Sequence, residues 1–554
     1  MNLNTRITGP AWAWVNSTVD IISSLYAELW YDVITDIEYE SRIKWWVNYF
    51  DVNISDNSEL FLTKYSDIIL AFNADSLQKQ LHSLKKWWTI IINNKWLKKI
   101  TEDLSDYQIL DLEITDKYDN TYLLGIYALY LNLDLNIILE KVDTVFSRKW
   151  EEIVNKNKDI IKNIFETYNI AKKSNISLTR VAEAKKINYW NKALTYWAIE
   201  WGLEFYSAYP MTPASTVLSE VIWSGKVKFL QAEDEIAVAN STLWASFTWK
   251  RAMCGTSGWG FALMTEAISF AVQAEFPMTV ILAQRAGPST GTPTYQEQWD
   301  INFALNPTFW DFEHIVLYPS SLEEAYYFGW LALNIADKYQ TQVILLMDKQ
   351  SAELHATHWD FSAPTIDRWV VLENPSENYK RYELTNSGIS PRVNVWTKNW
   401  DFIATSYEHD EYGATSEDSE LKVKFTEKRF KKLQNFFKKE GISGYEIINP
   451  AAKKMIVTYS FTKYTAEHFV KNNPEYGLII IKFLKPIDER LRDEIISNKY
   501  EELIFAESNY SGQVEKHLSN ELGLKFIPNL KISNLRKYDL FPFYIEDFNE
   551  LLNK

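Results

Sequence analysis

Cysteine is almost absent from this chain of 554 residues, since Cys254 is the single one. One thiol excludes an internal disulfide framework, a structural zinc site built from four cysteines and a self-contained iron–sulfur cluster. Cys254 lies in the apolar run RAMCGT, and we interpret it as a small buried hydrophobic residue of a strand.

Long apolar runs are also missing, and the net charge is negative. No apolar run approaches the roughly 18 residues of a membrane span. The start, MNLNTRITGP, lacks a basic segment followed by an apolar one, so we expect no signal peptide and a cytoplasmic protein. The net charge is −15, from 58 basic and 73 acidic residues. A surface that follows phosphates needs clustered Lys and Arg, so with this acidic charge we expect no nucleic-acid partner. The lack of a long apolar run predicts no membrane partner.

Glycine is scarce and tryptophan is abundant. The chain has 17 glycines, whereas glycine makes up about 7% of average proteins. It has 23 tryptophans, and all of them lie between Trp12 and Trp400. Either the protein is rich in tryptophan, or many tryptophans stand where glycine belongs.

The alternation of strand and helix patterns predicts an α/β fold in three blocks. The first block ends near residue 178, and its short apolar runs are typical of buried parallel strands. These runs are YDVITDIEY (31–39), SDIILAFNA (66–74), TIIINNK (89–95) and DYQILDLEI (106–114). The stretch 151–175 is predicted to be a helix at the end of this block.

Two further α/β blocks are predicted at 185–365 and 446–554. Strands are expected at 204–210, 227–232, 251–256, 278–284, 313–319, 342–348, 453–460, 478–484 and 502–508. Between the two blocks, the polar segment 366–445 reads as an irregular connection outside the core. His409, in its acidic EHDE run, is expected in an exposed loop, and no metal site is assigned.

Nine motifs occur in this chain in collinear order. They are YPMTPAST (209–216), EDEIA (233–237), GTSGWGFALMTEA (255–267), QRAGPSTGTPTYQEQWDINFAL (284–305), SRIKWWVNYFDV (41–52), GISPR (388–392), SYEHDEYG (406–413), SNYSGQ (508–513) and KYDLFPF (537–543). Together they resemble the alpha subunit of the 2-oxoacid:ferredoxin oxidoreductases, which are thiamine diphosphate enzymes, in the form with the gamma domain fused at the N-terminus. The resemblance covers nearly the whole chain.

The resemblance assigns a domain to each block. It implies a gamma-type α/β domain at 1–178 and a pyrimidine-binding thiamine diphosphate domain at 185–365. A connecting segment at 366–445 and a transketolase C-terminal-like domain at 446–554 follow.

Tryptophan stands where these proteins have glycine. The chain has GPAWAW for the family's GPAGAG, SRIKWW for SRIKGG, TSGWGF for TSGGGF and EQWD for EQGD. Glycine is used in such turns because it adopts positive φ at little cost and admits close backbone approach. We infer that UGA codons are read as glycine in the source. The residues expected to fit badly are Trp12, Trp14, Trp45, Trp46, Trp87, Trp88, Trp259 and Trp299, whereas Trp223 and Trp330 match less clearly.

Glu235 is the candidate catalytic residue and cofactor ligand. Thiamine diphosphate needs a carboxylate beside N1′ of its aminopyrimidine, and in a dry site that hydrogen bond is strong. Glu235 follows the strand VKFLQA at a helix start, where loops line the cleft of an α/β sheet, and it matches the family's cofactor glutamate. The alternative is an acid that stabilises the helix N-terminus, which is the preferred reading for Glu233 and Asp234.

A protein that binds the carboxylate and ketone of a 2-oxoacid needs a planar cationic group, such as a guanidinium, and hydroxyl donors. By resemblance, Thr212 matches a substrate-binding threonine, and Arg285 and Thr294 match the residues that bind its carboxylate. The alternatives are a turn cap for Thr212 and a surface salt bridge for Arg285. The segment expected to approach the cofactor contains Gly255, Thr256, Ser257, Gly258 and Gly260, and its alternative is a simple strand-to-helix turn.

The sequence lacks a GDG-type diphosphate and magnesium motif and the cysteines of an electron relay. The resemblance therefore implies that thiamine diphosphate with Mg is shared with a beta subunit, which also carries a 4Fe–4S cluster. The gamma part is associated in the family with subunit contacts and coenzyme A. GPAWAW is not G-x-G-x-x-G, so NAD binding has weak support.

The predicted function is oxidative decarboxylation of a 2-oxoacid with coenzyme A, giving acyl-CoA, CO2 and reduced ferredoxin. 2-Oxoglutarate is the favoured substrate, followed by pyruvate or a branched-chain 2-oxoacid. The alternatives are a non-catalytic assembly subunit of the same fold and an NAD-dependent dehydrogenase.

Overall fold

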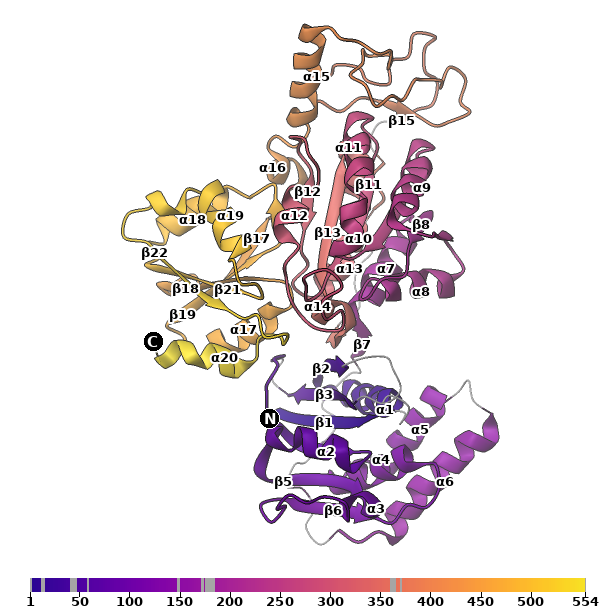
Figure 1. Cartoon of the computed structure of the whole chain (residues 1–554), viewed down its shortest axis with the longest axis vertical. Coiled ribbons are helices and arrows are strands. Elements are labelled where there is room, and N and C mark those ends of the chain that lie inside the picture. The colour runs from indigo at the N-terminus through magenta and orange to yellow at the C-terminus, as the bar shows by residue number, and fades with distance from the viewer. Residues whose placement is uncertain are drawn as a thin grey trace. The chain divides into compact units, whose positions relative to one another are not determined.

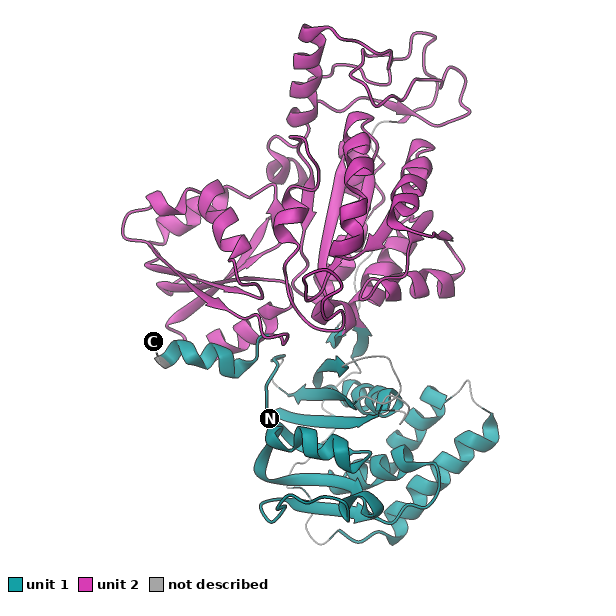
Figure 2. Cartoon of the chain, in the orientation of Figure 1, with its two compact units in different colours: residues 1–188, 354–360, 543–554 teal, residues 189–353, 361–542 magenta. Residues whose placement is uncertain are grey.

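The computed structural model describes residues 2–10, 15–39, 47–56, 59–146, 150–170, 174, 185–358, 365–368 and 371–553. Contacts divide the chain into two compact units, coloured separately in Figure 2. Unit 1 contains residues 1–188, 354–360 and 543–554, and unit 2 contains residues 189–353 and 361–542.

Unit 1 is built on an eight-stranded mixed sheet with the order β6-β5-β4-β1-β3-β2-β14-β7. Its strands are β1 (Asn2–Pro10), β2 (Asp32–Tyr39), β3 (Val47–Ser55), β4 (Ser66–Ala71), β5 (Leu84–Asn93), β6 (Gln108–Leu112), β7 (Lys186–Tyr189) and β14 (His355–His358). The expected parallel pairing is confirmed for β4, β5 and β6. It is wrong for β2, which pairs antiparallel with β3. The short connection between these two strands suits an antiparallel pair, because a parallel neighbour needs a long crossover.

Two apolar layers cover the two faces of this sheet. Alternate residues of β4 enter different cores: Ile68 and Leu70 join one core, and Ile69 and Ala71 join the other. The helices of unit 1 are α1 (Val15–Glu28), α2 (Ala74–Gln80), α3 (Asn94–Leu97), α4 (Asp119–Tyr130), α5 (Leu135–Phe146), α6 (Glu151–Thr167) and α20 (Ile545–Asn549). The C-terminal segment is tied to this unit by the backbone hydrogen bond from Ile545 to Leu62 (2.9 Å).

The first sheet of unit 2 has seven strands in the order β20-β12-β13-β11-β10-β8-β9 (Figure 1). The strands are β8 (Phe205–Ala208), β9 (Lys228–Gln231), β10 (Ala252–Thr256), β11 (Met278–Gln284), β12 (Ile315–Leu317), β13 (Gln342–Asp348) and β20 (Phe483–Lys485). All neighbours from β12 to β9 are parallel, as the sequence predicts, and β20 is antiparallel to β12.

Helices lie on both faces of this parallel sheet. Figure 1 shows α7 and α13 together on one face and α9, α10 and α11 on the other. The helices are α7 (Trp190–Glu200), α8 (Ser215–Ser224), α9 (Glu235–Phe247), α10 (Gly258–Leu263), α11 (Thr265–Gln273), α12 (Ile301–Leu305), α13 (Leu322–Tyr339) and α14 (Lys349–Glu353).

The second sheet of unit 2 has five strands in the order β17-β19-β18-β21-β22. The strands are β17 (Tyr445–Ile448), β18 (Lys454–Tyr459), β19 (Tyr476–Ile481), β21 (Glu502–Glu507) and β22 (Lys531–Arg536), and the helices are α17 (Thr462–Asn472), α18 (Arg490–Ser497) and α19 (Gln513–Glu521). Short 3-10 turns lie at Leu81–Ser83, Leu524–Phe526 and Glu550–Asn553. One hydrophobic core includes Val280 and Leu346 of the first sheet and Val457 and Ile479 of the second. The three expected α/β blocks therefore appear as three sheets, two of which share a core.

The segment between these sheets differs from the irregular exposed connection expected from its polarity. It contains β15 (Val371–Leu372), β16 (Arg392–Val393), α15 (Ser419–Lys431) and α16 (Phe436–Glu440). The prediction that His409 is exposed is wrong, because its ring is buried against Tyr382 (4.1 Å between centroids) and Phe425 (5.0 Å). Charged residues of this segment are paired inside the fold: Lys428 pairs with Glu275, and Arg429 pairs with Glu408.

Candidate functional site

The predicted site residues follow four neighbouring parallel strands. Thr212 follows β8, Glu235 follows β9, the 257–260 segment follows β10, and Arg285 follows β11. The carboxyl ends of parallel strands meet at one edge of the sheet, which is where α/β folds bind ligands. The chain order thus brings four distant motifs to the same edge of the seven-stranded sheet.

Glu235 is the first residue of α9 and is buried, with 4% of its surface exposed. Its Oε1 accepts a hydrogen bond from Thr256 Oγ1 at 3.3 Å. The helix cap is Asp234, whose side chain accepts from the backbone N–H of Ala237 at 2.8 Å. Since Asp234 caps the helix, the Glu235 carboxylate is left facing the end of β10.

The glycines after β10 leave room for acidic side chains. A Cβ added at Gly260 would overlap Glu235 Oε1 and Thr256 Oγ1, and one added at Gly258 would overlap the Asp300 carboxylate. Gly255 lies within β10, and a Cβ there would meet the Tyr206 hydroxyl. Gly258 and Gly260 therefore border candidate site carboxylates, whereas Gly255 packs against the buried Tyr206.

Arg285 and Asp300 face a second part of the site. Arg285 Nη1 donates a hydrogen bond of 2.8 Å to the backbone oxygen of Thr212. A cavity of about 530 Å³ is lined by Gly258, Trp259, Arg285, Gly287, Pro288, Ser289, Trp299 and Asp300. Burial raises the pKa of Asp300 to about 6, and the nearby Arg285 opposes this rise. Burial lowers the pKa of Arg285, an effect that Asp300 partly offsets.

Met211 connects the two parts of the site. Its sulfur accepts a hydrogen bond from Ser257 Oγ (2.6 Å), and it lies 4.0 Å from Thr256 Oγ1. Met211 precedes Thr212, whose backbone holds Arg285. Ser257 precedes the helix start at Gly258. Short contacts around the ends of β8 and β10 therefore link five predicted residues, which are Thr212, Glu235, Thr256, Ser257 and Arg285.

Thr294 is less directly connected. It is buried within the loop after β11, where Ala286 and Thr292 form a β-bridge. Among the residues that the structure describes, no hydrogen bond joins Thr294 to Glu235 or Arg285. Thr212 also contacts Arg285 through its backbone and not its hydroxyl. The substrate-binding roles of these two hydroxyls stay predictions.

Sequence reasoning missed Asp300, Met211 and Tyr206. Asp300 belongs to the EQWD motif, which drew attention only through its tryptophan. A signal was present, because an acidic residue shortly after a cationic one in the same loop can pair with it. Tyr206 lies inside β8, and its buried hydroxyl has no hydrogen-bond partner among the described residues.

Cys254 is buried in β10, as the sequence predicts. Burial raises the pKa of its thiol to about 12, so the thiol is not poised for nucleophilic chemistry.

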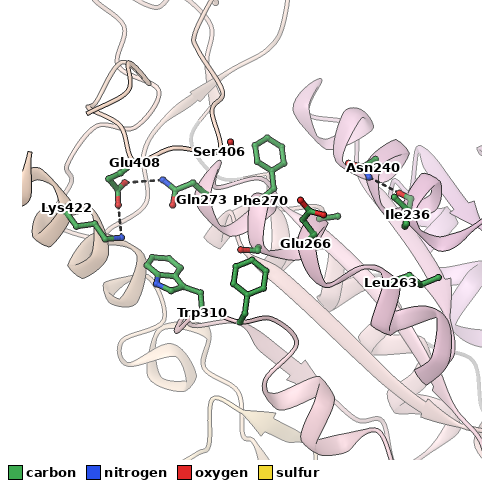
Figure 3. A pocket seen from close by; sticks show the side chains of 13 residues that line it. Ile236, Asn240, Leu263, Glu266, Phe270, Gln273, Trp310, Ser406, Glu408 and Lys422 are labelled. Carbon is green, nitrogen blue, oxygen red and sulfur yellow. Dashed lines mark hydrogen bonds and ion pairs between the residues drawn. The ribbon is translucent and has the colours of Figure 1, made fainter. Parts of the chain in front are cut away.

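A larger cavity of about 640 Å³ lies beside the site on the α9 and α11 side (Figure 3). Ile236, which follows Glu235, contributes to its wall, and Phe270 and Trp310 add aromatic surface. At the far wall, Glu408 accepts hydrogen bonds from Gln273 (3.1 Å) and Lys422 (2.9 Å). Sequence analysis did not anticipate this cavity.

Ion pairing holds the far wall of the larger cavity in place. Burial alone would raise the pKa of Glu408, but the hydrogen bonds and charges of Arg429, Lys422 and Gln273 together outweigh burial and lower that pKa to about 2. Glu408 therefore stays ionised at neutral pH and keeps its segment attached to α11.

The sequence matches two family descriptions. Residues 197–428 match "Pyruvate flavodoxin/ferredoxin oxidoreductase, thiamine diP-bdg", and residues 6–167 match "Pyruvate ferredoxin/flavodoxin oxidoreductase". The fold and these matches define a thiamine diphosphate-binding oxidoreductase domain in unit 2.

Comparison with similar proteins shows which family of oxidoreductases the chain belongs to. The 2-oxoacid:ferredoxin oxidoreductase alpha subunit of Sulfolobus sp. is 26% identical, over 100% of this chain and 97% of that protein. The 2-oxoglutarate synthase subunit KorA of Methanocaldococcus jannaschii is 33% identical, over 52% of this chain and 78% of that protein. The structure of 2-oxoglutarate:ferredoxin oxidoreductase from Magnetococcus marinus superimposes with a TM-score of 0.87 at 26% identity, covering 100% and 99% of the two chains. The chain belongs to the 2-oxoacid:ferredoxin oxidoreductase family, as an alpha subunit.

The residues around Glu235 suit an aminopyrimidine. In the described part of the chain, no Lys, Arg or His lies within 4.0 Å of its carboxylate, which has one hydrogen bond from Thr256. A buried carboxyl group without a cation is stabilised by a hydrogen-bond donor from a ligand. Gly260 has no side chain, so only backbone lies beside the Glu235 carboxylate at this point.

No described helix is both long and apolar enough to cross a membrane.

Proposed function

We propose that this chain is the fused gamma/alpha subunit of a coenzyme A-dependent 2-oxoacid:ferredoxin oxidoreductase. The 2-oxoacid loses CO2, its acyl group forms a thioester with coenzyme A, and the released electron pair reduces ferredoxin. The buried Glu235 at the carboxyl edge of the parallel sheet carries the proposal. 2-Oxoglutarate is the favoured substrate, because the similar Magnetococcus marinus enzyme is described with 2-oxoglutarate, coenzyme A and succinyl-CoA bound.

Glu235 is proposed to share a proton with N1′ of the aminopyrimidine. Bound thiamine diphosphate supplies a nucleophilic carbon that stabilises the charge left when the 2-oxoacid loses CO2. Thr256 Oγ1 orients the Glu235 carboxylate, since it donates to Oε1 at 3.3 Å. The surrounding apolar core limits water, which strengthens a hydrogen bond at this position.

Arg285 is proposed to bind the carboxylate of the 2-oxoacid. Its guanidinium lines the cavity of about 530 Å³ and is held by the Thr212 backbone. Asp300 lines the same cavity and attracts the guanidinium electrostatically. A charge-assisted bond from a planar guanidinium fits a carboxylate well. The Thr212 and Thr294 hydroxyls are proposed as further donors.

A beta subunit is proposed to complete the site. It would supply the diphosphate and Mg side of the cofactor, a 4Fe–4S cluster and the contact with ferredoxin. The face beside Glu235 supports this arrangement, because Ile236, Leu263 and Phe309 expose apolar surface there. Ile236, Leu263 and Phe309 line the larger cavity shown in Figure 3. Exposed apolar groups that gather on one face mark interaction surfaces.

The test is turnover by the complex of this chain with its beta subunit. The complex should reduce ferredoxin with 2-oxoglutarate, or with pyruvate or a branched-chain 2-oxoacid, only when coenzyme A and thiamine diphosphate are present. Glu235→Gln should abolish most of this turnover. Glu233→Gln is the matched control, because Glu233 lies two residues away and is exposed.

Each outcome decides between the alternatives. A complex that turns over none of these substrates, or whose turnover survives Glu235→Gln, excludes this catalytic role and favours an assembly subunit. The chain alone should be inactive with a low-potential acceptor dye and should bind no iron, since it has a single cysteine. Reduction of NAD by the chain would support the dehydrogenase alternative.

A further inference from the structure

Four tryptophans have a backbone conformation that favours glycine. The φ angles are 77° at Trp30, 69° at Trp87, 58° at Trp249 and 72° at Trp396. In this left-handed region a Cβ crowds the following carbonyl, and a bulky residue there is an outlier. Among the described non-glycine residues with positive φ, only asparagine occurs more often than tryptophan. Asparagine is the usual exception to the glycine preference, and tryptophan is not.

Trp30 and Trp249 occupy the glycine position of a common helix ending. After α1, Trp30 N–H bonds to Ala27 O (3.2 Å) and Tyr31 N–H bonds to Tyr26 O (3.0 Å). This pair of bonds is a Schellman motif, whose left-handed residue is usually glycine. After α9, the same pair of bonds forms around Trp249 (2.8 and 3.0 Å).

The chain ends another helix in this way with a true glycine. After α7, Gly202 N–H bonds to Ile199 O (3.2 Å), Leu203 N–H bonds to Ala198 O (2.8 Å), and Gly202 has φ 91°. Asn132 and Gln340 hold the equivalent place after α4 and α13 with flexible polar side chains. Trp30 and Trp249 differ from these residues because an indole is both bulky and rigid.

Trp87 and Trp396 have a strained backbone, and burial of their side chains contributes little stability to offset the strain. Their side chains are 78% and 84% exposed. Trp87 lies in β5 where the pairing with β4 shifts register, between Leu84 and Thr89. A strand irregularity with one residue in the left-handed region favours glycine there.

The buried Trp249 leaves its surroundings with unsatisfied donors. The guanidinium groups of Arg381 and Arg392 lie 4.9 Å and 4.4 Å from the centre of its ring. In the described part of the chain, Trp249 Nε1, Arg381 Nη1 and Arg392 Nε are buried without a hydrogen-bond partner. Buried donors are normally satisfied. Glycine at position 249 would remove the indole Nε1 and leave room for water to bond the two arginines.

We propose that positions 30, 87, 249 and 396 are glycine positions, and that their codons are read as glycine in the natural host. The composition agrees, because 17 glycines are too few and 23 tryptophans too many for a typical chain.

Of the tryptophans predicted from sequence to fit badly, Trp87 has a positive φ, whereas Trp88, Trp259 and Trp299 do not. Trp12, Trp14, Trp45 and Trp46 lie outside the described residues. Trp259 and Trp299 are assigned the same origin in this proposal from the sequence comparison alone. Both indoles line the cavity that contains Arg285, so glycine at these positions widens access to it.

The stability test compares glycine with alanine at one position. Both Trp396→Gly and Trp396→Ala remove the exposed indole, but only glycine relieves the left-handed backbone. In the full chain, Trp396→Gly should melt about 2–4 °C above Trp396→Ala. Trp87→Gly and Trp87→Ala should show the same order in unit 1.

Trp244 is the matched control in unit 2. It is 70% exposed but lies inside α9, where glycine is less favourable than alanine. The order should reverse there, with Trp244→Ala melting above Trp244→Gly. A Trp396→Gly variant that melts at or below Trp396→Ala would overturn the backbone argument.

The second test determines the residue directly. Peptide mass spectrometry of the protein from its natural source should find glycine at 30, 87, 249 and 396, and the gene should carry UGA there. Tryptophan in those peptides, or UGG codons, would refute the proposal. Neither result depends on enzyme activity, so the proposed function is tested separately.

Discussion

Thr256 Oγ1 lies 3.3 Å from Glu235 Oε1, although the two residues belong to different strand–helix units. The last residue of β10 therefore positions the first residue of α9. Gly260 also borders these two oxygens, because a Cβ added at Gly260 would overlap both of them. The position of the Glu235 carboxylate thus depends on a residue without a side chain.

Gly260→Ala should impair turnover of the assembled enzyme without unfolding the chain. The new Cβ would overlap Glu235 Oε1 and Thr256 Oγ1, so the carboxylate must move. A displaced acid–base group costs up to about 10²–10⁴-fold in rate. The measurement is kcat of the complex, together with the melting temperature. Gly441→Ala is the control for kcat, since an added Cβ there meets nothing within 4 Å and Gly441 lies after α16, outside the candidate site. Equal kcat for the two variants would show that Gly260 does not position Glu235.

Arg285→Ala should raise KM for the 2-oxoacid by about 10–100-fold, with a smaller effect on kcat. The variant removes a charge-assisted hydrogen bond, whose loss costs about 1.5–3 kcal/mol. Arg285→Lys should recover part of the affinity, because it keeps the charge but loses the planar fork. Steady-state kinetics at saturating coenzyme A measure both constants. An unchanged KM in Arg285→Ala would remove this residue from substrate binding.

Asp300 should give unit 2 a distinctive pH dependence of stability. Burial raises its pKa from 3.8 to about 6, so between these values the folded state binds more protons than the unfolded state. The free energy of unfolding should therefore fall as pH rises through this interval, by about 3 kcal/mol. Asp300→Asn cannot titrate and should lose this contribution.

Denaturant unfolding of both proteins at several pH values in this interval measures the effect. The difference between their unfolding free energies should change with pH in the stated direction and level off above pH 6. Parallel curves would show that Asp300 has an ordinary pKa.

The fold class and the clustering of motifs could be predicted from sequence, because both follow from strand order. The strands MTVILAQ and QVILLMD have continuous apolar centres, which are typical of buried parallel strands, and they form β11 and β13. Glu235 and Arg285 could be placed at one edge for the same reason.

Features that depend on tertiary pairing could not be predicted. The antiparallel direction of β2 is set by its partner β3. The sequence of β2, DVITDIEY, mixes apolar and acidic residues and does not reveal that direction. His409 reads as exposed because its neighbours are acidic, but Arg429 pairs with the adjacent Glu408. Asp300 gains its raised pKa from burial, which local sequence does not reveal.

Lys428 should make the protein more stable as pH rises above neutrality. It is fully buried and pairs with Glu275 at 2.5 Å, while Lys432 pairs with the same carboxylate at 2.7 Å. Arg381 adds a third cation to this cluster. Burial lowers the pKa of Lys428 to about 7, and the neighbouring cations reinforce this, although Glu275 opposes it.

The sign follows from proton binding. Between pH 7 and the ordinary lysine pKa of 10.5, the unfolded state holds the Lys428 proton and the folded state has lost it. The free energy of unfolding should therefore increase with pH across this range. Lys428→Met removes the titrating group, while Lys432 still pairs with Glu275, so its stability should depend less on pH. Denaturation midpoints at pH 7, 8 and 9 decide the matter: a wild-type midpoint that stays level or falls, while that of Lys428→Met follows the same course, would place the Lys428 pKa near its ordinary value.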